Sequence, residues 1–148
     1  MRRFGVSLLF ILAALVSMTA LAPRTIEIVA SDNMKWTVTT ITAKPGELLR
    51  IKLTSKGVIP KVAMAHNFVL LKAGVLVQKF VDAGASARAT DFIAPAMKAQ
   101  VIAASKFAGP GDTVWLEFKA PAKAGSYPYL CTFSGHYQAG MKGTLIVK

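Results

Sequence analysis

The stretch from residue 131 to residue 141 concentrates side chains that bind soft metal ions. These eleven residues include Cys131, His136 and Met141, and Cys131 is the only cysteine in a chain that has two histidines. A thiolate, an imidazole and a thioether together select copper over magnesium, calcium or manganese. A trigonal Cys/His/His set with a weak axial methionine is typical of a blue-copper electron-transfer site. His66, the other histidine, is the one remaining source of the second imidazole.

Each of these residues also has an ordinary explanation. A lone cysteine is usually a small buried hydrophobe, a methionine usually fills a core, and a histidine is often only hydrogen-bonded. Against this, three ligand types converge on one loop bounded by Gly135 and Gly140, and the candidate site uses every histidine in the chain. We therefore favour copper binding.

Two other functional classes would use similar chemistry. A protein that stores or delivers copper in the periplasm also uses soft donors, although it favours exposed Met or His clusters, and this alternative stays open. A copper oxidase or nitrite reductase domain needs further histidines for its catalytic copper, and two histidines cannot supply them. We therefore expect a protein that is not an enzyme.

Two segments carry a family resemblance, residues 65–70 (AHNFVL) and residues 131–147. On these segments the chain resembles the cupredoxins, the type 1 blue copper proteins, in their azurin, auracyanin and plastocyanin-like branch, over residues 25–148. The resemblance implies His66, Cys131 and His136 as equatorial copper ligands and Met141 as the axial ligand. Four residues separate Cys131 from His136, as in azurin, and four separate His136 from Met141, which is similar to auracyanin and plastocyanin.

The resemblance also implies roles for residues around the metal. The Asn67 side chain would bond the Cys131 loop, and the backbone N–H groups of Asn67 and Phe133 would point at the thiolate sulfur and tune the reduction potential. An apolar electron-transfer surface would surround His136, formed by Met34, Met64, Ala65, Tyr137 and Ala139.

The chain departs from the family pattern at three points. Ser134 stands where azurin and auracyanin typically have proline, which restores a backbone donor. Ala65 replaces the glycine that precedes the first histidine of azurin, and we expect a four-coordinate metal without its carbonyl. A chain with one cysteine cannot form an internal disulfide, unlike azurin, so its sandwich must be stabilised by packing alone.

The first 22 residues have the pattern of an export signal. Two arginines at positions 2 and 3 precede an uncharged run over residues 4–22. Ala20-Leu21-Ala22 has the form of a cleavage site, but Pro23 is unfavourable as a first mature residue. The uncharged run is also about long enough to cross the hydrocarbon core, so an N-terminal membrane anchor competes with a signal peptide. Either reading predicts a periplasmic or extracytoplasmic domain over residues 23–148, free or anchored to the inner membrane.

Strand-like segments dominate the rest of the chain. Short stretches rich in β-branched and aromatic residues alternate with turn signals, and they cover residues 25–29, 36–42, 47–54, 67–71, 101–104, 113–118, 126–130 and 144–147. The pattern predicts an all-β domain, a two-sheet sandwich of about eight strands, which the resemblance specifies as a Greek-key sandwich or barrel. Residues 78–99 are alanine-rich and predict an excursion with a short helix and irregular chain. The resemblance implies that this excursion packs outside the barrel.

The charge of the chain bears on its partners. Without Arg2 and Arg3 the chain has 16 basic and 7 acidic side chains, a formal charge of +9. The charges are scattered along the chain, which with export argues against nucleic acid. Binding to an anionic membrane surface stays open. We expect a monomer whose partner is a redox protein, such as a cytochrome or a terminal oxidoreductase, with an acidic docking surface.

Overall fold

The computed structural model describes residues 22–148, which form eight strands and three short helices. The strands are β1 (Arg24–Ala30), β2 (Thr40–Ala43), β3 (Leu48–Ser55), β4 (Val69–Leu71), β5 (Val101–Ala104), β6 (Thr113–Lys119), β7 (Gly125–Leu130) and β8 (Lys142–Val147). Apart from Ala22, the predicted leader lies outside the described residues. Within residues 22–148, no helix combines the length and the apolar composition needed to cross a membrane.

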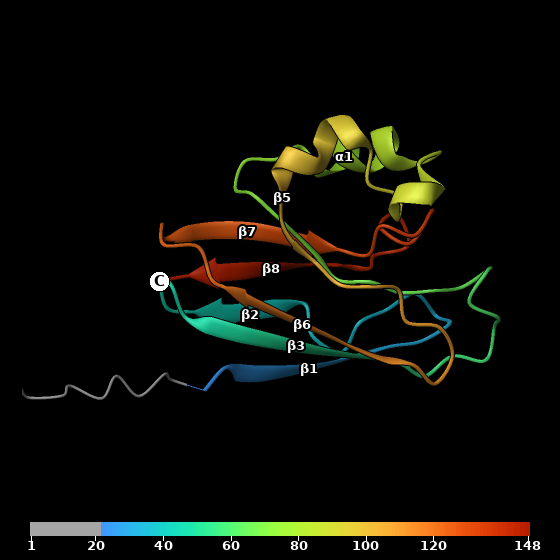
Figure 1. The fold of residues 1–148 in the computed structure, drawn as a ribbon, viewed down its shortest axis with the longest axis horizontal. Coiled ribbons are helices and arrows are strands. Elements are labelled where there is room, and N and C mark those ends of the chain that lie inside the picture. Colours follow the sequence, from blue (N-terminus) through green and yellow to red (C-terminus); the bar gives the residue numbers. More distant parts are fainter. Residues whose placement is uncertain (1–21) are drawn as a thin grey trace, which may run out of the picture.

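The strands form two sheets that pack face to face, as Figure 1 shows. One sheet has the strand order β1-β3-β6 and the other has the order β2-β8-β7-β4-β5. β1 runs parallel to β3 and β2 runs parallel to β8, while the other neighbours are antiparallel. This architecture confirms the predicted all-β sandwich of about eight strands.

The alternating pattern of β3 explains how the core forms. Leu49, Ile51 and Leu53 are fully buried, while the residues between them are partly exposed. Facing them across the sandwich is a stack of aromatic rings, with Tyr129 centred 4.7 Å from Phe68. Burying side chains of this size stabilises the fold by about 1.5–3 kcal/mol each.

Two strands are shorter than the sequence pattern predicts. The stretch predicted as a strand from residue 36 forms β2 only from Thr40, because Thr37 pairs with Val29 of the other sheet before the chain crosses over. The stretch predicted from residue 67 forms β4 only from Val69, because the Asn67 side chain bonds to Thr132.

The predicted excursion contains α1 (Val77–Gly84) and two 3-10 helices, η1 (Arg88–Thr90) and η2 (Pro95–Gln100). It lies over the outer face of the five-stranded sheet (Figure 1). Phe80 and Val81 of α1 pack there against a buried cluster formed by Val69, Leu71 and Leu130. The expectation of a helical segment outside the barrel is confirmed.

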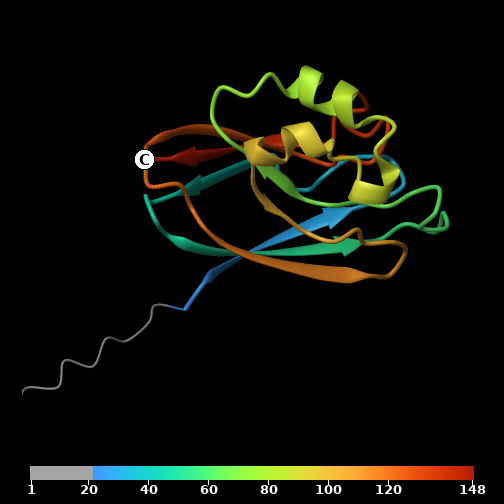
Figure 2. The ribbon, with the colours of Figure 1, turned by 45° about the horizontal axis from the view of Figure 1, so that its top comes forward.

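The loops that follow β1, β3, β5 and β7 gather at one end of the sandwich. Figures 1 and 2 show these loops at the end opposite the C-terminus and the start of β1. The loops are tied together by hydrogen bonds, since Lys35 Nζ donates to the Ala139 carbonyl over 2.6 Å and His66 forms a bridge with Ala108. This end of the molecule holds the residues that the sequence singled out.

Candidate metal centre

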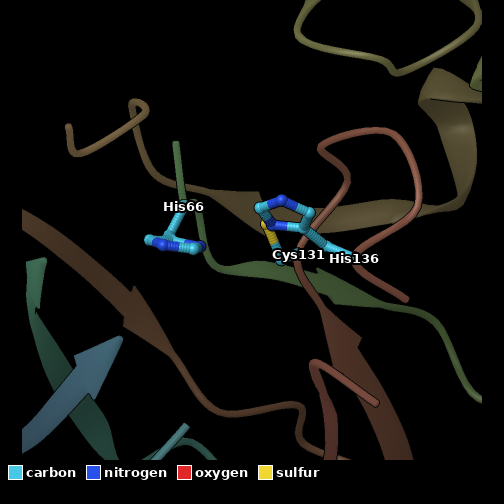
Figure 3. A group of neighbouring side chains, drawn as sticks. All are labelled: His66, Cys131 and His136. Atoms are coloured by element: carbon cyan, nitrogen blue, oxygen red, sulfur yellow. The ribbon is translucent and has the colours of Figure 1, made fainter. Parts of the chain in front are cut away.

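Three potential metal ligands from two distant parts of the chain meet at this end. The donor atoms of His66, Cys131 and His136 all lie within 4.8 Å of one another, and all three side chains are buried. Cys131 Sγ is 3.4 Å from His136 Nδ1, and the two imidazole rings are centred 5.0 Å apart. Figure 3 shows the two rings and the sulfur turned toward a common space.

The loop between β7 and β8 supplies Cys131, His136 and Met141. It is closed by its own backbone, because Cys131 N–H donates to the Met141 carbonyl over 3.1 Å and Met141 N–H donates to the His136 carbonyl over 3.0 Å. Gly135 and Gly140 have φ values of 83° and 105°, which lets the chain turn sharply at both places. Met141 is fully buried in the same hydrophobic cluster as Cys131.

His66 comes from the other side of the site and is held by its backbone alone. Its N–H donates to the Ala108 carbonyl over 2.9 Å, and its own carbonyl accepts from Ala108 N–H over 2.8 Å. Among the described residues, neither ring nitrogen of His66 has a hydrogen-bond partner, although both are buried. A buried imidazole without a partner is costly unless it binds something. The ring therefore fits a metal ligand better than a structural histidine.

The surroundings of the Cys131 sulfur combine burial with backbone donors. Burial raises the pKa of the thiol to about 12, while the backbone N–H groups of Asn67 and Phe133 act in the opposite direction. The Ala65 carbonyl lies 3.8 Å from the sulfur. A thiol in this position stays protonated at neutral pH until a metal displaces the proton.

Both histidines are held in the neutral form. Burial lowers the pKa of His66, opposed by the charge of Asp32. Burial, and next the nearby His66, lower the pKa of His136 to about 4. Neutral imidazole is the form that binds metal ions, so the site is prepared for a metal at pH 7.

The side chain of Asn67 joins the two sides of the site. Its Oδ1 accepts from Thr132 N–H over 2.9 Å, and its Nδ2 donates to Thr132 Oγ1 over 2.9 Å. Phe133 lies against His136, with ring centroids 4.8 Å apart. The sequence did not predict Thr132 as the partner of Asn67, because a threonine beside a cysteine forms no recognisable motif.

The predicted electron-transfer surface needs one correction. Met34, Met64, Tyr137 and Ala139 are partly exposed, but Ala65 is only 2% exposed and does not contribute surface. Ala65 instead lies inside the site, with its carbonyl oxygen 3.8 Å from the Cys131 sulfur. Sequence reasoning also missed the exposed apolar residues on the loop after β3, which are Val58, Ile59 and Val62.

The geometry agrees with comparisons to known proteins. The sequence profile described as "Copper binding proteins, plastocyanin/azurin family" matches residues 23–148. The chain therefore belongs to the plastocyanin/azurin family of copper binding proteins. Its metal is copper, and the group of His66, Cys131 and His136 fits a single copper ion.

Two relatives and one solved structure illustrate the similarity. The chain is 35% identical to auracyanin-A of Chloroflexus aurantiacus over 127 residues, which cover 84% of this chain and 75% of that protein. It is 34% identical to azurin of Pseudomonas aeruginosa over 141 residues, covering 93% of this chain and 94% of azurin. The dithionite-reduced auracyanin of Roseiflexus castenholzii superposes with a TM-score of 0.73 at 32% identity, covering 86% and 98% of the two chains.

Proposed function

We propose that this chain is a type 1 blue copper protein that carries one electron at a time between exported or membrane-bound redox partners. The observation that carries the proposal is the buried meeting of His66, Cys131 and His136, in which both ring nitrogens of His66 lack a partner among the described residues. Bound copper would supply a one-electron change between Cu(I) and Cu(II).

In this proposal His66, Cys131 and His136 are the equatorial ligands and Met141 is the weak axial ligand. Electron transfer is fast when the ligands move little between the two oxidation states. His66 is fixed by two backbone bonds to Ala108, and the loop that carries the other three donors is closed between Cys131 and Met141. The chain therefore favours one geometry and keeps water away from the donors.

The same observations argue against copper delivery and against catalysis. A protein that hands copper on needs donors that a recipient can reach, but here Cys131 and His66 are fully buried and His136 is only 2% exposed. The two histidines of the chain both belong to this one group, so no imidazole remains for a second, catalytic copper.

We place the docking surface at the end of the molecule that holds the site. The partly exposed Met34, Met64, Tyr137 and Ala139 belong to it, and the exposed Val58, Ile59 and Val62 extend it. The described residues have a formal charge of +9, so the partner we propose is a redox protein with an acidic surface. The carrier would act as a monomer and without nucleic acid.

The proposed location is outside the cytoplasm, with residues 1–22 as a signal peptide or an anchor. β1 begins at the end of the sandwich opposite the site, as Figure 1 shows. A chain anchored through its N-terminus would therefore present the copper end away from the membrane. Both readings of the leader are compatible with electron exchange at that end.

A reduction experiment separates an electron carrier from a copper-delivery protein. The copper-loaded protein is reduced with ascorbate in the presence of bicinchoninate, a chelator of Cu(I), and is then reoxidised. We expect the copper to remain bound and the absorption of the oxidised protein to return. Loss of the metal to the chelator on reduction would instead support copper delivery. The Cys131→Ser variant, which lacks the thiolate, is the control expected to lose its copper.

A further inference from the structure

The loop after Cys131 is hydrogen-bonded both to Asn67, the residue next to His66, and to the helical excursion. The Thr132 side chain is buried, and its hydroxyl donates to the Asp91 carbonyl over 2.7 Å. The same oxygen accepts the bond from Asn67 Nδ2 over 2.9 Å. A continuous chain of hydrogen bonds thus runs from Asn67 through Thr132 to the backbone of the excursion.

The backbone that accepts this bond has an unusual conformation. Asp91 and Phe92 follow η1 and have φ values of 55° and 57°, a left-handed region that non-glycine residues rarely adopt. Two such residues in succession persist only where the surrounding structure holds them in place. Part of that support comes from α1, because a Cβ added to Gly84 would lie 2.1 Å from the Phe92 carbonyl oxygen.

The unusual turn also places an aromatic ring against the site. Phe92 is buried, and its ring is centred 5.3 Å from that of Phe133 and 6.2 Å from that of Phe107. Phe133 in turn lies 4.8 Å from the His136 ring. Phe133 also supplies one of the two backbone N–H groups directed at the Cys131 sulfur. The excursion therefore contacts both residues that directly follow Cys131.

We propose that the excursion over residues 77–100 is a positioning element for the copper-ligand loop, acting through the Thr132 hydroxyl and the Phe92 ring. It holds the Phe133 N–H against the Cys131 sulfur. Hydrogen bonds to the sulfur withdraw electron density from the thiolate and favour Cu(I), so they raise the reduction potential. The inference rests on the proposed function, since the potential is a property of the bound copper.

Two pairs of variants test this role. Thr132→Val removes the hydroxyl at nearly constant shape, while Thr132→Ser keeps it. Gly84→Ala displaces the Phe92 carbonyl from outside the site, while Lys79→Ala changes an exposed residue of the same helix. For each variant the hydrogen exchange of the Phe133 amide is measured by NMR in the copper-free protein. The reduction potential and the visible spectrum are then measured in the copper-loaded protein.

We expect Thr132→Val and Gly84→Ala to speed exchange of the Phe133 amide by roughly five- to tenfold, as for the loss of one hydrogen bond, and to lower the potential. Thr132→Ser and Lys79→Ala should resemble the original protein in both measurements. The proposal is wrong if Thr132→Val leaves both unchanged. It is also wrong if Gly84→Ala leaves both unchanged, because the excursion would then not position the ligand loop.

The proposed function and the positioning role of the excursion can fail separately. If the unaltered protein forms no blue centre with copper, the proposed function is wrong. Exchange of the Phe133 amide in the copper-free variants still decides whether the excursion positions the loop.

Discussion

Cys131 determines the chemistry of the site because it is the strongest soft donor and is fully buried. Its sulfur is fully buried, lies beside two backbone N–H groups and faces the two imidazoles. Burial of a thiolate without a metal is unfavourable, which is why its pKa is raised. A copper ion would make this burial favourable, so the site is most stable when it is loaded.

Met141 has a different role from the other three donors, and a substitution can separate it from them. Met141→Leu conserves side-chain volume and should cost less than about 1.5 kcal/mol of stability. We expect the intense visible band to persist, because the equatorial donors remain. Loss of the thioether weakens the stabilisation of Cu(II), so the reduction potential should rise. We expect a rise on the order of 59 mV, which corresponds to a tenfold change in the equilibrium constant between the two oxidation states.

Voltammetry and absorption of the Met141→Leu variant check this expectation. Complete loss of copper from the variant would contradict a weak axial role. A potential that does not change would show that the thioether does not contact the metal.

The sequence was sufficient to predict which residues meet at the site, but not the contacts that surround them. The residue types and the scarcity of histidine pointed to His66, Cys131 and His136, which the structure brings together. The burial of Ala65 and the hydroxyl bond of Thr132 depend on how separate loops pack. No spacing along the chain encodes such contacts, so they could not be predicted.

Among the elements, β8 follows the ligand loop directly and packs closely against its neighbours at Gly143. A Cβ added there would lie 2.3 Å from the Tyr129 ring and 2.6 Å from the Thr39 carbonyl. Gly143→Ala should therefore destabilise the protein by about 1–3 kcal/mol through overpacking. Urea denaturation of the copper-free protein measures the change in the free energy of unfolding.

Thr42→Ala, at an exposed position of the neighbouring β2, is the matched control. It should change the free energy of unfolding by less than about 1 kcal/mol. Equal stability of Gly143→Ala and the unaltered protein would mean that Tyr129 can move aside freely, which its hydrogen bond to the Val38 carbonyl argues against.

The elements themselves were largely predictable, because alternating burial leaves a clear pattern in strands such as β3 and β6. The predicted starts of β2 and β4 were wrong by four and two residues, respectively, since side-chain bonds of Thr37 and Asn67 replace strand pairing there. The helical excursion was predicted from composition. Its contact with the ligand loop was not, because that contact depends on two left-handed residues.

For the molecule as a whole, the buried donors predict how stability depends on pH without copper. His66 and His136 have lowered pKa values in the folded state, so the unfolded chain binds more protons below about pH 6.5. Their contribution to the free energy of unfolding is present above that pH and is lost as the pH falls toward 4. Cys131 has a raised pKa, so its contribution is present below about pH 9 and is lost as the pH rises toward 12.

Thermal unfolding of the copper-free protein should therefore show its highest midpoint between about pH 6.5 and pH 9. In the Cys131→Ser variant, the thermal midpoint should fall less steeply above pH 9. A midpoint that stays constant from pH 7 to pH 5 would show that the histidines are not buried in the neutral form.

The positive charge of the whole molecule predicts how it meets reaction partners. At a formal charge of +9 over the described residues, oxidation of the reduced protein by anionic ferricyanide should slow as salt is added. A cationic cobalt complex should show the opposite trend. Stopped-flow rates across a range of ionic strength measure both, and rates that do not depend on salt would remove the argument for an acidic partner.

Titration of the copper-free protein with Cu(II), followed by visible absorption, tests the blue copper site itself. We expect an intense thiolate-to-copper band that saturates at one copper per chain and is absent from the Cys131→Ser variant. A colourless complex, or a band that persists in Cys131→Ser, would contradict the assignment of a blue copper site to His66, Cys131 and His136.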